Sequence, residues 1–487
     1  MTADAVATRR GRPTTLGALV DVTPPSLHAH LLGDPSVVAT GMTHDSRLVE
    51  AGDLFACIRG ANVDGHDLAG VAVGAGAIAL LVDHPVDEPV AQLVVDDTRR
   101  AVGPIAAALH DHPSSAIAVV GITGTNGKTT TTHLLASILR AAGWPTDVIG
   151  TLSGRHTTPE APELQARLDG FRAAGDRAVV MEVSSHALAM HRVDGTRFAA
   201  AVFTNLGADH LDLHGTPEEY FRAKASLFTP ELAAIGVTNV DDAHGLLLLD
   251  AATIEMVPFS LADVDDLEVT ADHHAFTWRG RRITVGLGGS FNVANSLAAA
   301  TTAAVLGVDL DAIVAGLAAA DAVPGRFERI LPLGVEPVDV IVIVDYAHTP
   351  DGLEQVILAA RGVTDGEVTV VFGAGGDRDH AKRPRMGAVA AELADHVVVT
   401  SDNPRSEPPD AIISDVMAGV AAGARAHVVV EPDRVAAIAR AVEAARPGDV
   451  VVVAGKGHET TQTIADRIID LDDRAVVRDL LTKRAAR

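Results

Sequence analysis

A glycine-rich segment between residues 119 and 131 has the composition and spacing of a phosphate-binding loop. An apolar run ends at Ile122, the sequence Thr-Gly-Thr-Asn-Gly-Lys-Thr-Thr-Thr follows over 123–131, and a helical pattern comes next. A strand that leads through a glycine turn into a helix N-terminus directs backbone N–H groups and the helix dipole at an anion. The lysine then reaches the outer phosphates, and a hydroxyl can hold Mg²⁺. The predicted ATP contacts in this loop are Gly124, Thr125, Asn126, Gly127, Lys128, Thr129 and Thr130.

The loop departs from the general ATP-binding pattern at one position. The spacing G-x-x-x-x-G-K-[ST] requires a glycine where Ile122 stands, so the segment matches a narrower set of ATPases. The alternative is a plain glycine turn before a helix that carries a surface lysine. The apolar run before the turn and the helical pattern after it favour the phosphate loop.

Groups that can ligate a metal follow the loop along the chain. The apolar run 179–181 ends in Glu182, and a carboxylate at a strand end beside an ATP loop suits Mg²⁺, because hard cations take oxygen ligands. A second strand-like run, 201–204, leads into a polar segment that contains His210, and Lys224 lies in an amphipathic helical pattern. Each residue has a purely structural alternative: a helix-capping Ser184, a satisfied core His210, or a solvated Lys224. Their order after the loop favours a common metal and phosphate centre.

The composition limits the classes of function. The chain has 487 residues, with 64 acidic against 39 basic ones and a formal net charge of −25. Nucleic-acid binding relies on basic surface and on aromatic side chains for base stacking, and aromatic residues make up only 3% of this chain. We therefore expect no nucleic-acid partner. Anionic small molecules would be held by local lysines, arginines, backbone amides and metal.

The single cysteine and the apolar segments indicate in which cellular compartment the protein acts. Cys57 alone excludes an intramolecular disulfide and a cysteine-based zinc cluster, and its apolar surroundings predict a buried structural thiol. The arginines near the N-terminus are not followed by the apolar stretch of a signal peptide. The longest apolar run, around 71–82, is too short and too rich in glycine to cross a bilayer. We expect a cytoplasmic protein with no membrane partner.

The sequence divides into three blocks, which predict a three-domain α/β protein. We place them at 1–112, 113–331 and 332–487, with the phosphate loop in the second. The third block alternates apolar runs with helical patterns such as 435–444, which predicts a mainly parallel, Rossmann-like sheet. Its predicted strands are 340–344, 368–372, 396–399, 427–430 and 450–453. The glycine cluster 373–378 fails the G-x-G-x-x-G fingerprint because Arg378 occupies the last glycine position, so we expect no nicotinamide site.

Taken together, the motifs resemble those of the Mur ligases, and the resemblance covers nearly the whole chain. They are T-G-T-N-G-K-T-T-T (123–131), T-T-P-E (157–160), M-E-V-S-S-H-A-L (181–188), F-T-N-L-G-A-D-H-L-D-L-H-G (203–215), F-N-V-A-N (291–295), V-P-G-R (323–326), V-D-Y-A-H-T-P (344–350), G-G-D-R-D (375–379), D-N-P-R (402–405) and G-K-G-H-E (455–459). The chain looks most like the members that add the third peptide residue of peptidoglycan. The resemblance implies a UDP-substrate-binding N-terminal domain, a central ATP-binding domain and a C-terminal domain that binds the amino acid.

The resemblance also implies roles for the residues around ATP. Lys128 and Thr129 would hold phosphates and Mg²⁺, with Glu182 and His210 as further metal ligands. Lys224 would be carbamylated by CO₂, which turns a cation into a carboxylate that seats a second Mg²⁺. A lysine must be neutral to capture CO₂, and its ordinary pKa is about 10.4. The residues implied to contact the nucleotide are Asn292, Asn295, Arg326 and Asp345.

Two further groups of residues are implied to bind substrates. His44 and Ser46 would grip the UDP end of a UDP-muramoyl-dipeptide, and its dipeptide part would meet Thr157, Thr158, Ser184 and Arg192. His156 and Met190 depart from the asparagine and glutamine of a family relative, and a methionine cannot donate as an amide does. The residues implied to bind the incoming amino acid are Arg378, Asp402, Asn403, Pro404, Arg405, Gly455 and Glu459.

The amino acid itself is predicted to be meso-diaminopimelate. Its distal carboxylate, absent from L-lysine, calls for a rigid bidentate donor such as Arg405, and D-N-P-R marks the diaminopimelate enzymes of the family. L-Lysine or another diamine stays open as the substrate, as does a purely structural Arg405 that caps the Asn-Pro turn.

The resemblance also implies a reaction. A substrate carboxylate is activated with ATP as an acyl-phosphate, and two bridging cations lie between the anions. The third block is expected to close on the second.

Two rival functions are weighed against this prediction, and the second of them differs from it in class. A folate polyglutamylating ligase shares the chemistry, but its loop typically reads T-G-T-N-G-K-G-S and it lacks D-N-P-R. A non-catalytic ATP-binding partner would be expected to lose a metal or lysine position, and none is missing from this sequence. The family analogy suggests a monomer.

Overall fold

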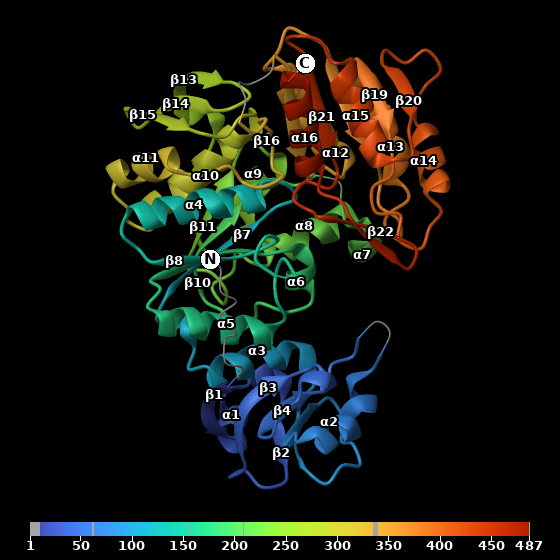
Figure 1. Ribbon diagram of the computed structural model, residues 1–487. Helices are drawn as coiled ribbons and strands as arrows, with labels where there is room; N and C mark the ends of the chain where they lie inside the picture. The colour runs from blue at the N-terminus through green and yellow to red at the C-terminus, as the bar shows by residue number, and fades with distance from the viewer. Residues whose placement is uncertain (1–9, 61–62, 155, 208, 335–338, 487) are drawn as a thin grey trace.

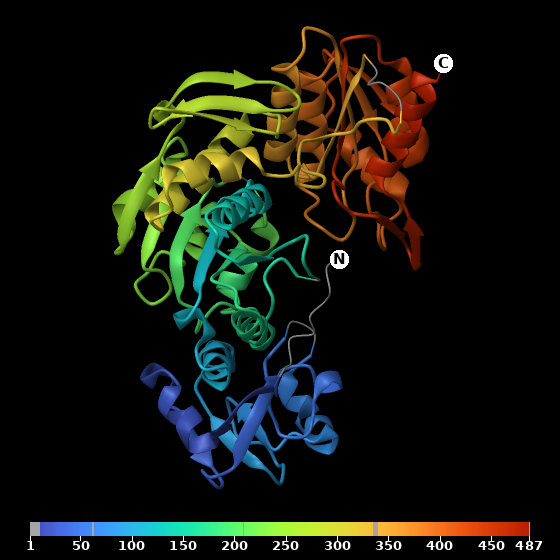
Figure 2. The ribbon, with the colours of Figure 1, turned by 60° about the vertical axis from the view of Figure 1, so that its left-hand side comes forward.

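The computed structural model describes residues 10–60, 63–154, 156–207, 209–334 and 339–486. Three six-stranded sheets follow one another along the chain, each with its own helices, and are called the first, second and third sheet (Figure 1). The first forms a lobe at one end of the molecule, the second lies in the middle, and the third lies beside the far end of the second (Figure 2). The predicted three-domain α/β architecture is confirmed, while the residue boundaries 112/113 and 331/332 stay predictions.

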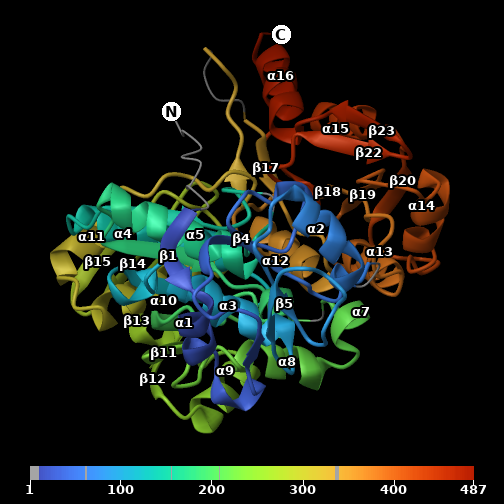
Figure 3. The same cartoon turned by 90° about the horizontal axis from the view of Figure 1, so that it is seen from below.

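The first sheet has the strand order β1-β3-β4-β5-β6-β2. Its four inner strands are parallel and both edge strands run antiparallel to them. The strands are β1 (Arg10–Thr15), β2 (His30–Leu32), β3 (Val38–Thr43), β4 (Asp53–Ala56), β5 (Ala79–Val82) and β6 (Ala91–Val94). The main helices are α1 (Leu16–Val22), α2 (Ala69–Ala75) and α3 (Thr98–Leu109), and Figure 3 shows this lobe from below. Cys57 is fully buried there, and burial raises the pKa of its thiol to about 12, as expected of a structural cysteine.

The second sheet has six parallel strands in the order β12-β11-β10-β7-β9-β8. They are β7 (Ala118–Thr123), β8 (Thr146–Ile149), β9 (Ala178–Glu182), β10 (Phe198–Phe203), β11 (Ile235–Asn239) and β12 (Glu255–Phe259). The chain first builds the sheet on one side of β7 and then on the other. Ligands of open parallel sheets bind beyond the carboxyl ends of the strands at such a switch point. The phosphate loop follows β7 directly.

Helices cover both faces of the second sheet. One face packs against α4 (Lys128–Ala141), α10 (Phe291–Val305) and α11 (Leu310–Ala318), in one continuous apolar core. The other face packs against α5 (Ala161–Ala174) and α8 (Pro217–Ala225), with a separate core. Beyond α10 and α11 lies an antiparallel sheet of β13 (Val264–Val269), β14 (His274–Trp278) and β15 (Arg281–Val285), which the sequence analysis did not predict (Figure 1).

The third sheet has the order β16-β17-β21-β18-β19-β20, parallel except for β16. Its strands are β16 (Glu328–Arg329), β17 (Ile341–Asp345), β18 (Val368–Phe372), β19 (His396–Val399), β20 (His427–Val430) and β21 (Val450–Ala454), so all five predicted strands are confirmed. Its first strand, β16, lies before the predicted 331/332 boundary. Valines fill the inner strands because both faces are covered. The covering helices are α12 (Pro350–Arg361), α13 (Lys382–Leu393), α14 (Pro409–Met417), α15 (Arg434–Ala444) and α16 (Asp473–Ala485).

One further element projects from the third sheet. The hairpin of β22 (Thr461–Ile464) and β23 (Arg467–Asp470) follows β21 and lies below the third sheet in Figure 1. Among the helices of the described ranges, none combines the length and apolar character needed to cross a bilayer.

Candidate active site

The phosphate loop has a shape that only glycine permits at two positions. Gly124 has φ 150°, and a Cβ there would lie 1.9 Å from Thr204 Oγ1. Gly127 has φ 85°, and a Cβ would lie 2.3 Å from Asn295 Oδ1. Helix α4 begins at Lys128 without a side-chain cap, so the N–H groups of its first turn stay available to an anion. The local sequence thus builds an anion-binding helix terminus.

Lys128 is tied back to the loop. Its Nζ donates to the carbonyl oxygens of Gly124 at 2.9 Å and Thr125 at 2.8 Å. Burial lowers the pKa of this amine, while the carboxylates of Glu182 and Asp209 oppose the shift. The Lys128 amine is therefore held at the phosphate loop.

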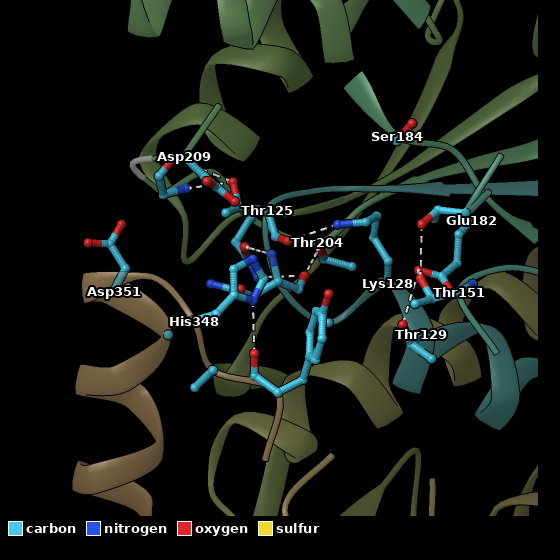
Figure 4. Close-up of a pocket in the computed structure, with 18 of the residues that line it drawn as sticks. Thr125, Lys128, Thr129, Thr151, Glu182, Ser184, Thr204, Asp209, His348 and Asp351 are labelled. Carbon is cyan, nitrogen blue, oxygen red and sulfur yellow. Dashed lines mark hydrogen bonds between the residues drawn. The ribbon is translucent and has the colours of Figure 1, made fainter. Parts of the chain in front are cut away.

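Glu182 ends β9 and is 1% exposed. Its carboxylate accepts from Thr129 Oγ1 at 3.0 Å, from the Thr151 backbone N–H at 2.8 Å and from Thr151 Oγ1 at 3.2 Å. Gly150 makes room for it, since a Cβ there would lie 2.3 Å from Glu182 Oε1. Figure 4 shows Glu182, Thr129 and Thr151 gathered at one side of the cavity. This group of carboxylate and hydroxyl oxygens suits a hard divalent cation.

Lys224 is buried, so the alternative of a solvated surface lysine is wrong. The side chain is 1% exposed, its Nζ donates to the Gly124 carbonyl at 2.9 Å, and it lies over the Tyr220 ring at 4.4 Å. Burial lowers its pKa well below the ordinary lysine value, and the charge of Lys128 lowers it further. A buried amine with a lowered pKa therefore lies beside the phosphate loop.

His210 lies in the loop that follows β10, with a left-handed φ of 54°. Its Nε2 is 3.4 Å from Asp209 Oδ2, and its ring meets that of His186 edge to face at a centroid distance of 4.8 Å. Desolvation lowers the pKa of His210 to about 4, although Asp209 opposes the shift. The imidazole is therefore neutral at pH 7 and can offer a nitrogen lone pair to a metal.

Residues next to the third sheet close the other side of the cavity. Arg326 donates to Thr129 Oγ1 at 3.3 Å and lies over the Tyr346 ring at 4.3 Å. Asp345 accepts from the backbone N–H groups of Phe327 and Ala347; burial raises its pKa, and Arg326 opposes the rise. His348 and Asp351 face the loop of Thr125 across the cavity in Figure 4.

The two predicted asparagines take different positions. Asn295 lines the cavity, and its amide donates to Asn292 Oδ1 at 2.9 Å. Asn292 is 1% exposed and donates to the Gly288 carbonyl at 2.7 Å, so it holds Asn295 from behind. Direct contact of Asn292 with a nucleotide stays a prediction.

The residues predicted for the dipeptide part of the substrate lie together. Thr157, Thr158, Ser184 and Arg192 line the same cavity as the phosphate loop. Thr158 Oγ1 donates to the Glu182 carbonyl at 2.9 Å, and Ser184 caps the short helix α6 (Ser185–Ala189). Of the two departures, His156 also lines the cavity, and the sulfur of Met190 lies 3.9 Å from a guanidinium nitrogen of Arg192.

His44 and Ser46 do not line this cavity. Ser46 begins a short 3-10 turn, and His44 Nδ1 is buried without a hydrogen-bond partner among the described residues. Near His44, Glu160 pairs with Arg99 of the first lobe at 2.8 Å and with Arg192 of the second at 2.9 Å. The predicted UDP contacts thus lie at the junction of the first two lobes, and their role stays a prediction.

The residues predicted for the amino acid lie at the carboxyl ends of third-sheet strands. Arg378, Asp402, Asn403, Arg405, Gly455 and Glu459 line the cavity, and Pro404 does not. Asn403 Nδ2 donates to Glu459 Oε2 at 2.7 Å, and Lys456 Nζ lies 3.3 Å from the same oxygen. Gly455 has φ 112° and lies against Asp402, since a Cβ would be 2.5 Å from Asp402 Oδ2.

One cavity of about 1240 Å³ therefore joins the phosphate loop to the predicted amino-acid site. Its lysine and arginine side chains can hold anionic groups: Lys128, Arg192, Lys224, Arg326, Arg378, Lys382 and Arg405. Carboxylates such as Glu182, Asp345 and Glu459 line it as well. Sequence reasoning missed Thr151, which holds Glu182, and Tyr220, which covers Lys224. Neither belongs to a recognisable local pattern.

Comparisons with known proteins agree with this geometry. Sequence models of the Mur ligases match residues 38–111 (catalytic domain), 122–303 (middle domain) and 325–457 (glutamate ligase domain). The UDP-N-acetylmuramoyl-L-alanyl-D-glutamate--2,6-diaminopimelate ligase of Streptomyces avermitilis is 46% identical, covering 91% of this chain and 92% of the relative. The protein of that name from Gloeobacter violaceus is 44% identical, covering 93% and 96%.

A solved structure extends the likeness to the fold. A structure of UDP-N-acetylmuramoyl-L-alanyl-D-glutamate--2,6-diaminopimelate ligase superimposes with a TM-score of 0.67 at 31% identity, covering 97% of this chain and 99% of the other. The resemblance predicted from the motifs is thereby confirmed over nearly the whole sequence. The chain belongs to the Mur ligase family.

Proposed function

We propose that the protein is an ATP-dependent, ADP-forming ligase of peptidoglycan precursor synthesis. It joins meso-diaminopimelate to UDP-N-acetylmuramoyl-L-alanyl-D-glutamate; the names of its relatives state a ligase of that precursor and 2,6-diaminopimelate. The observation that carries the proposal is the single cavity. It links a phosphate loop after β7 to two arginines, Arg378 and Arg405, after strands of another sheet.

The reaction needs an activated carboxylate. A carboxylate oxygen of the dipeptide attacks the γ-phosphorus of ATP, the bond to ADP breaks, and an acyl-phosphate forms. The amine of the incoming amino acid then attacks the acyl carbon and loses a proton, and phosphate leaves. The residues described contribute position and charge, since two anions must meet before the first step. Lys128 and Arg326 supply cationic groups at the phosphate end, and Arg192 does so at the dipeptide end.

The chain's residues fit the divalent cation that such a reaction requires. Glu182 and Thr129 would hold Mg²⁺ beside the phosphates, where the cation would offset the charge between the reacting anions. His210 and a carbamylated Lys224 would hold a second ion. The buried Lys224 amine with its lowered pKa supports the carbamate, because only the neutral amine adds CO₂.

The choice of amino acid rests on the loops of the third sheet. Arg405 and Arg378 both line the cavity and would receive the distal carboxylate of diaminopimelate, while Glu459 and Asp402 would face its ammonium groups. L-Lysine would leave the two arginines without an anion. Because the phosphate loop and these arginines belong to different sheets, we propose that the third lobe closes on the second during turnover.

The oligomeric state and the cellular location are part of the proposal. We propose a monomer, as the family analogy suggests. We propose a cytoplasmic location, where ATP and nucleotide-linked precursors are available.

Phosphate release tests the function. The purified protein is given ATP, Mg²⁺ and UDP-muramoyl-dipeptide, with meso-diaminopimelate, L-lysine or L-ornithine in parallel. We expect release only when dipeptide and amino acid are both present, and fastest with diaminopimelate. Equal release without dipeptide would contradict the proposal, and preference for L-lysine would overturn the assignment of Arg405.

A further inference from the structure

The two loops that carry Arg378 and Arg405 are fastened to each other. They follow the neighbouring parallel strands β18 and β19. Arg405 donates to the Gly376 carbonyl at 2.6 Å, and the Gly376 N–H donates to the Asn403 carbonyl at 2.9 Å. Ser406, next to Arg405, donates through its hydroxyl and backbone N–H to Asp377, next to Arg378, at 2.5 and 3.2 Å. The separation of the two arginines therefore depends on these contacts.

A buried guanidinium lies behind both loops. The Arg383 side chain, near the start of α13, is 1% exposed. It donates to both carboxylate oxygens of Glu407 at 2.7 and 2.9 Å, to Asp415 at 2.9 Å and to the Gly375 carbonyl at 3.2 Å. One side chain thus joins α13, both loops and α14.

Glu407 completes the connection. The oxygen that receives Arg383 Nη2 also accepts the Asp377 N–H at 2.6 Å. The hydrogen bonds from Arg383 hold the pKa of this carboxyl at about 2, so it is charged throughout the working pH range. Asp377 and Arg405 both have left-handed φ values, 54° and 53°, a conformation that such residues keep only when their surroundings fix it. Glu407, held by Arg383, fixes this conformation at Asp377 by accepting its N–H, while the Arg405 backbone pairs with Thr463 and Ala465 of the β22–β23 hairpin.

Neither residue of the pair lines the cavity. We propose that Arg383 and Glu407 are positioning residues that set the separation of Arg378 and Arg405, and so the preference for an amino acid with a distal carboxylate. The inference rests on the proposed function. A bidentate carboxylate contact depends on the placement of both donors, and a small displacement costs much of its strength.

The test uses Glu407→Gln and Arg383→Lys in the full-length protein, with kinetics for diaminopimelate and L-lysine. We expect the KM for diaminopimelate to rise at least about tenfold in each, with kcat and the KM for ATP within about twofold of the parent. Turnover of L-lysine, which has no distal carboxylate, should not fall. The ratio of kcat/KM for diaminopimelate to kcat/KM for L-lysine should therefore fall about tenfold.

Arg361→Lys is the matched control. Arg361 also pairs with a carboxylate, Asp395, and donates to two backbone carbonyls, but at the amino ends of β18 and β19. Arg361→Lys should lower the melting temperature, less than Arg383→Lys does because the Arg361 side chain is 31% exposed against 1% for Arg383, and should leave the amino-acid preference unchanged. If all three variants lose stability and none changes the preference, the pair is merely structural and the inference is wrong.

A double variant separates positioning from bulk stability. In an Arg405→Ala background, Glu407→Gln should raise the KM for diaminopimelate much less than it does in the parent, since its effect passes through Arg405. Full additivity would contradict the inference. Should the parent itself show no dipeptide-dependent use of diaminopimelate, the proposed function fails instead, which is a distinguishable result.

Discussion

Lys128 and Lys224 donate to the same acceptor: each amine lies 2.9 Å from the carbonyl oxygen of Gly124. Two ammonium groups at one carbonyl in a buried site repel each other, which is one reason why the pKa of Lys224 is lowered. Conversion of Lys224 to a carbamate would replace this repulsion with an attraction to Lys128 and to a divalent cation. The phosphate loop and the predicted modification are therefore parts of one electrostatic arrangement.

Lys224→Arg should lower kcat at least about a hundredfold, because arginine stays charged and cannot add CO₂. The lowered pKa of Lys224 favours the neutral amine that adds CO₂, and the carbamate should be lost as pH falls and the amine is protonated. Nuclear magnetic resonance with ¹³C-bicarbonate should show a carbamate signal in the parent alone. An active arginine variant, or a signal that persists in it, would disprove the modification.

Thr151→Val should raise the Mg²⁺ concentration needed for half-maximal phosphate release about tenfold, since it removes a hydroxyl that holds the Glu182 carboxylate. Thr151→Ser keeps the hydroxyl and should restore the parent value. The measurement is the Mg²⁺ dependence of phosphate release at saturating ATP. If valine and serine variants behave alike, Thr151 does not act through Glu182.

Gly127→Ala and Gly143→Ala compare the two ends of helix α4. Both glycines have positive φ, 85° and 75°, so each alanine is strained by about 1 kcal/mol. Only at Gly127 does the new Cβ meet a side chain, Asn295 at 2.3 Å; at Gly143 nothing lies within 4 Å. We expect kcat/KM for ATP to fall about a hundredfold in the first variant and to stay within about twofold in the second. Equal losses would show that strain alone accounts for the effect.

Arg405→Ala should raise the KM for diaminopimelate at least about thirtyfold, because the distal carboxylate loses a charged partner. The KM for ATP should not change. Arg425→Ala provides the control, since Arg425 forms an exposed ion pair with Asp395. The measurement is the KM for diaminopimelate and for ATP from steady-state kinetics. An unchanged KM for diaminopimelate in the Arg405 variant would show that another residue binds the distal carboxylate.

The parts of the site that follow strands could be predicted from the sequence. Glu182 and Arg405 come after valine-rich runs, and the carboxyl ends of parallel strands gather such residues at one edge. Lys224 could be selected only through the family motif. Its helix reads as amphipathic, and its burial depends on Tyr220 and on a loop a hundred residues away.

Residues that act through others were beyond sequence reasoning. Thr151 lies in a short loop without a pattern, and Arg383 reads as a surface cation on α13 although its side chain is 1% exposed. The β22–β23 hairpin accepts the Arg405 N–H through the Thr463 carbonyl at 3.0 Å, a pairing across 58 residues. Such contacts depend on tertiary placement, which local propensity does not encode.

The path of one oxygen atom tests the account most directly. UDP-muramoyl-dipeptide labelled with ¹⁸O in the reacting carboxylate is converted with ATP and diaminopimelate, and the products are weighed by mass spectrometry. Attack of the carboxylate on the γ-phosphorus predicts one ¹⁸O in each inorganic phosphate released, with ADP unlabelled. Label in AMP, or phosphate free of ¹⁸O while the amide forms, would contradict the acyl-phosphate and with it the role assigned to this cavity.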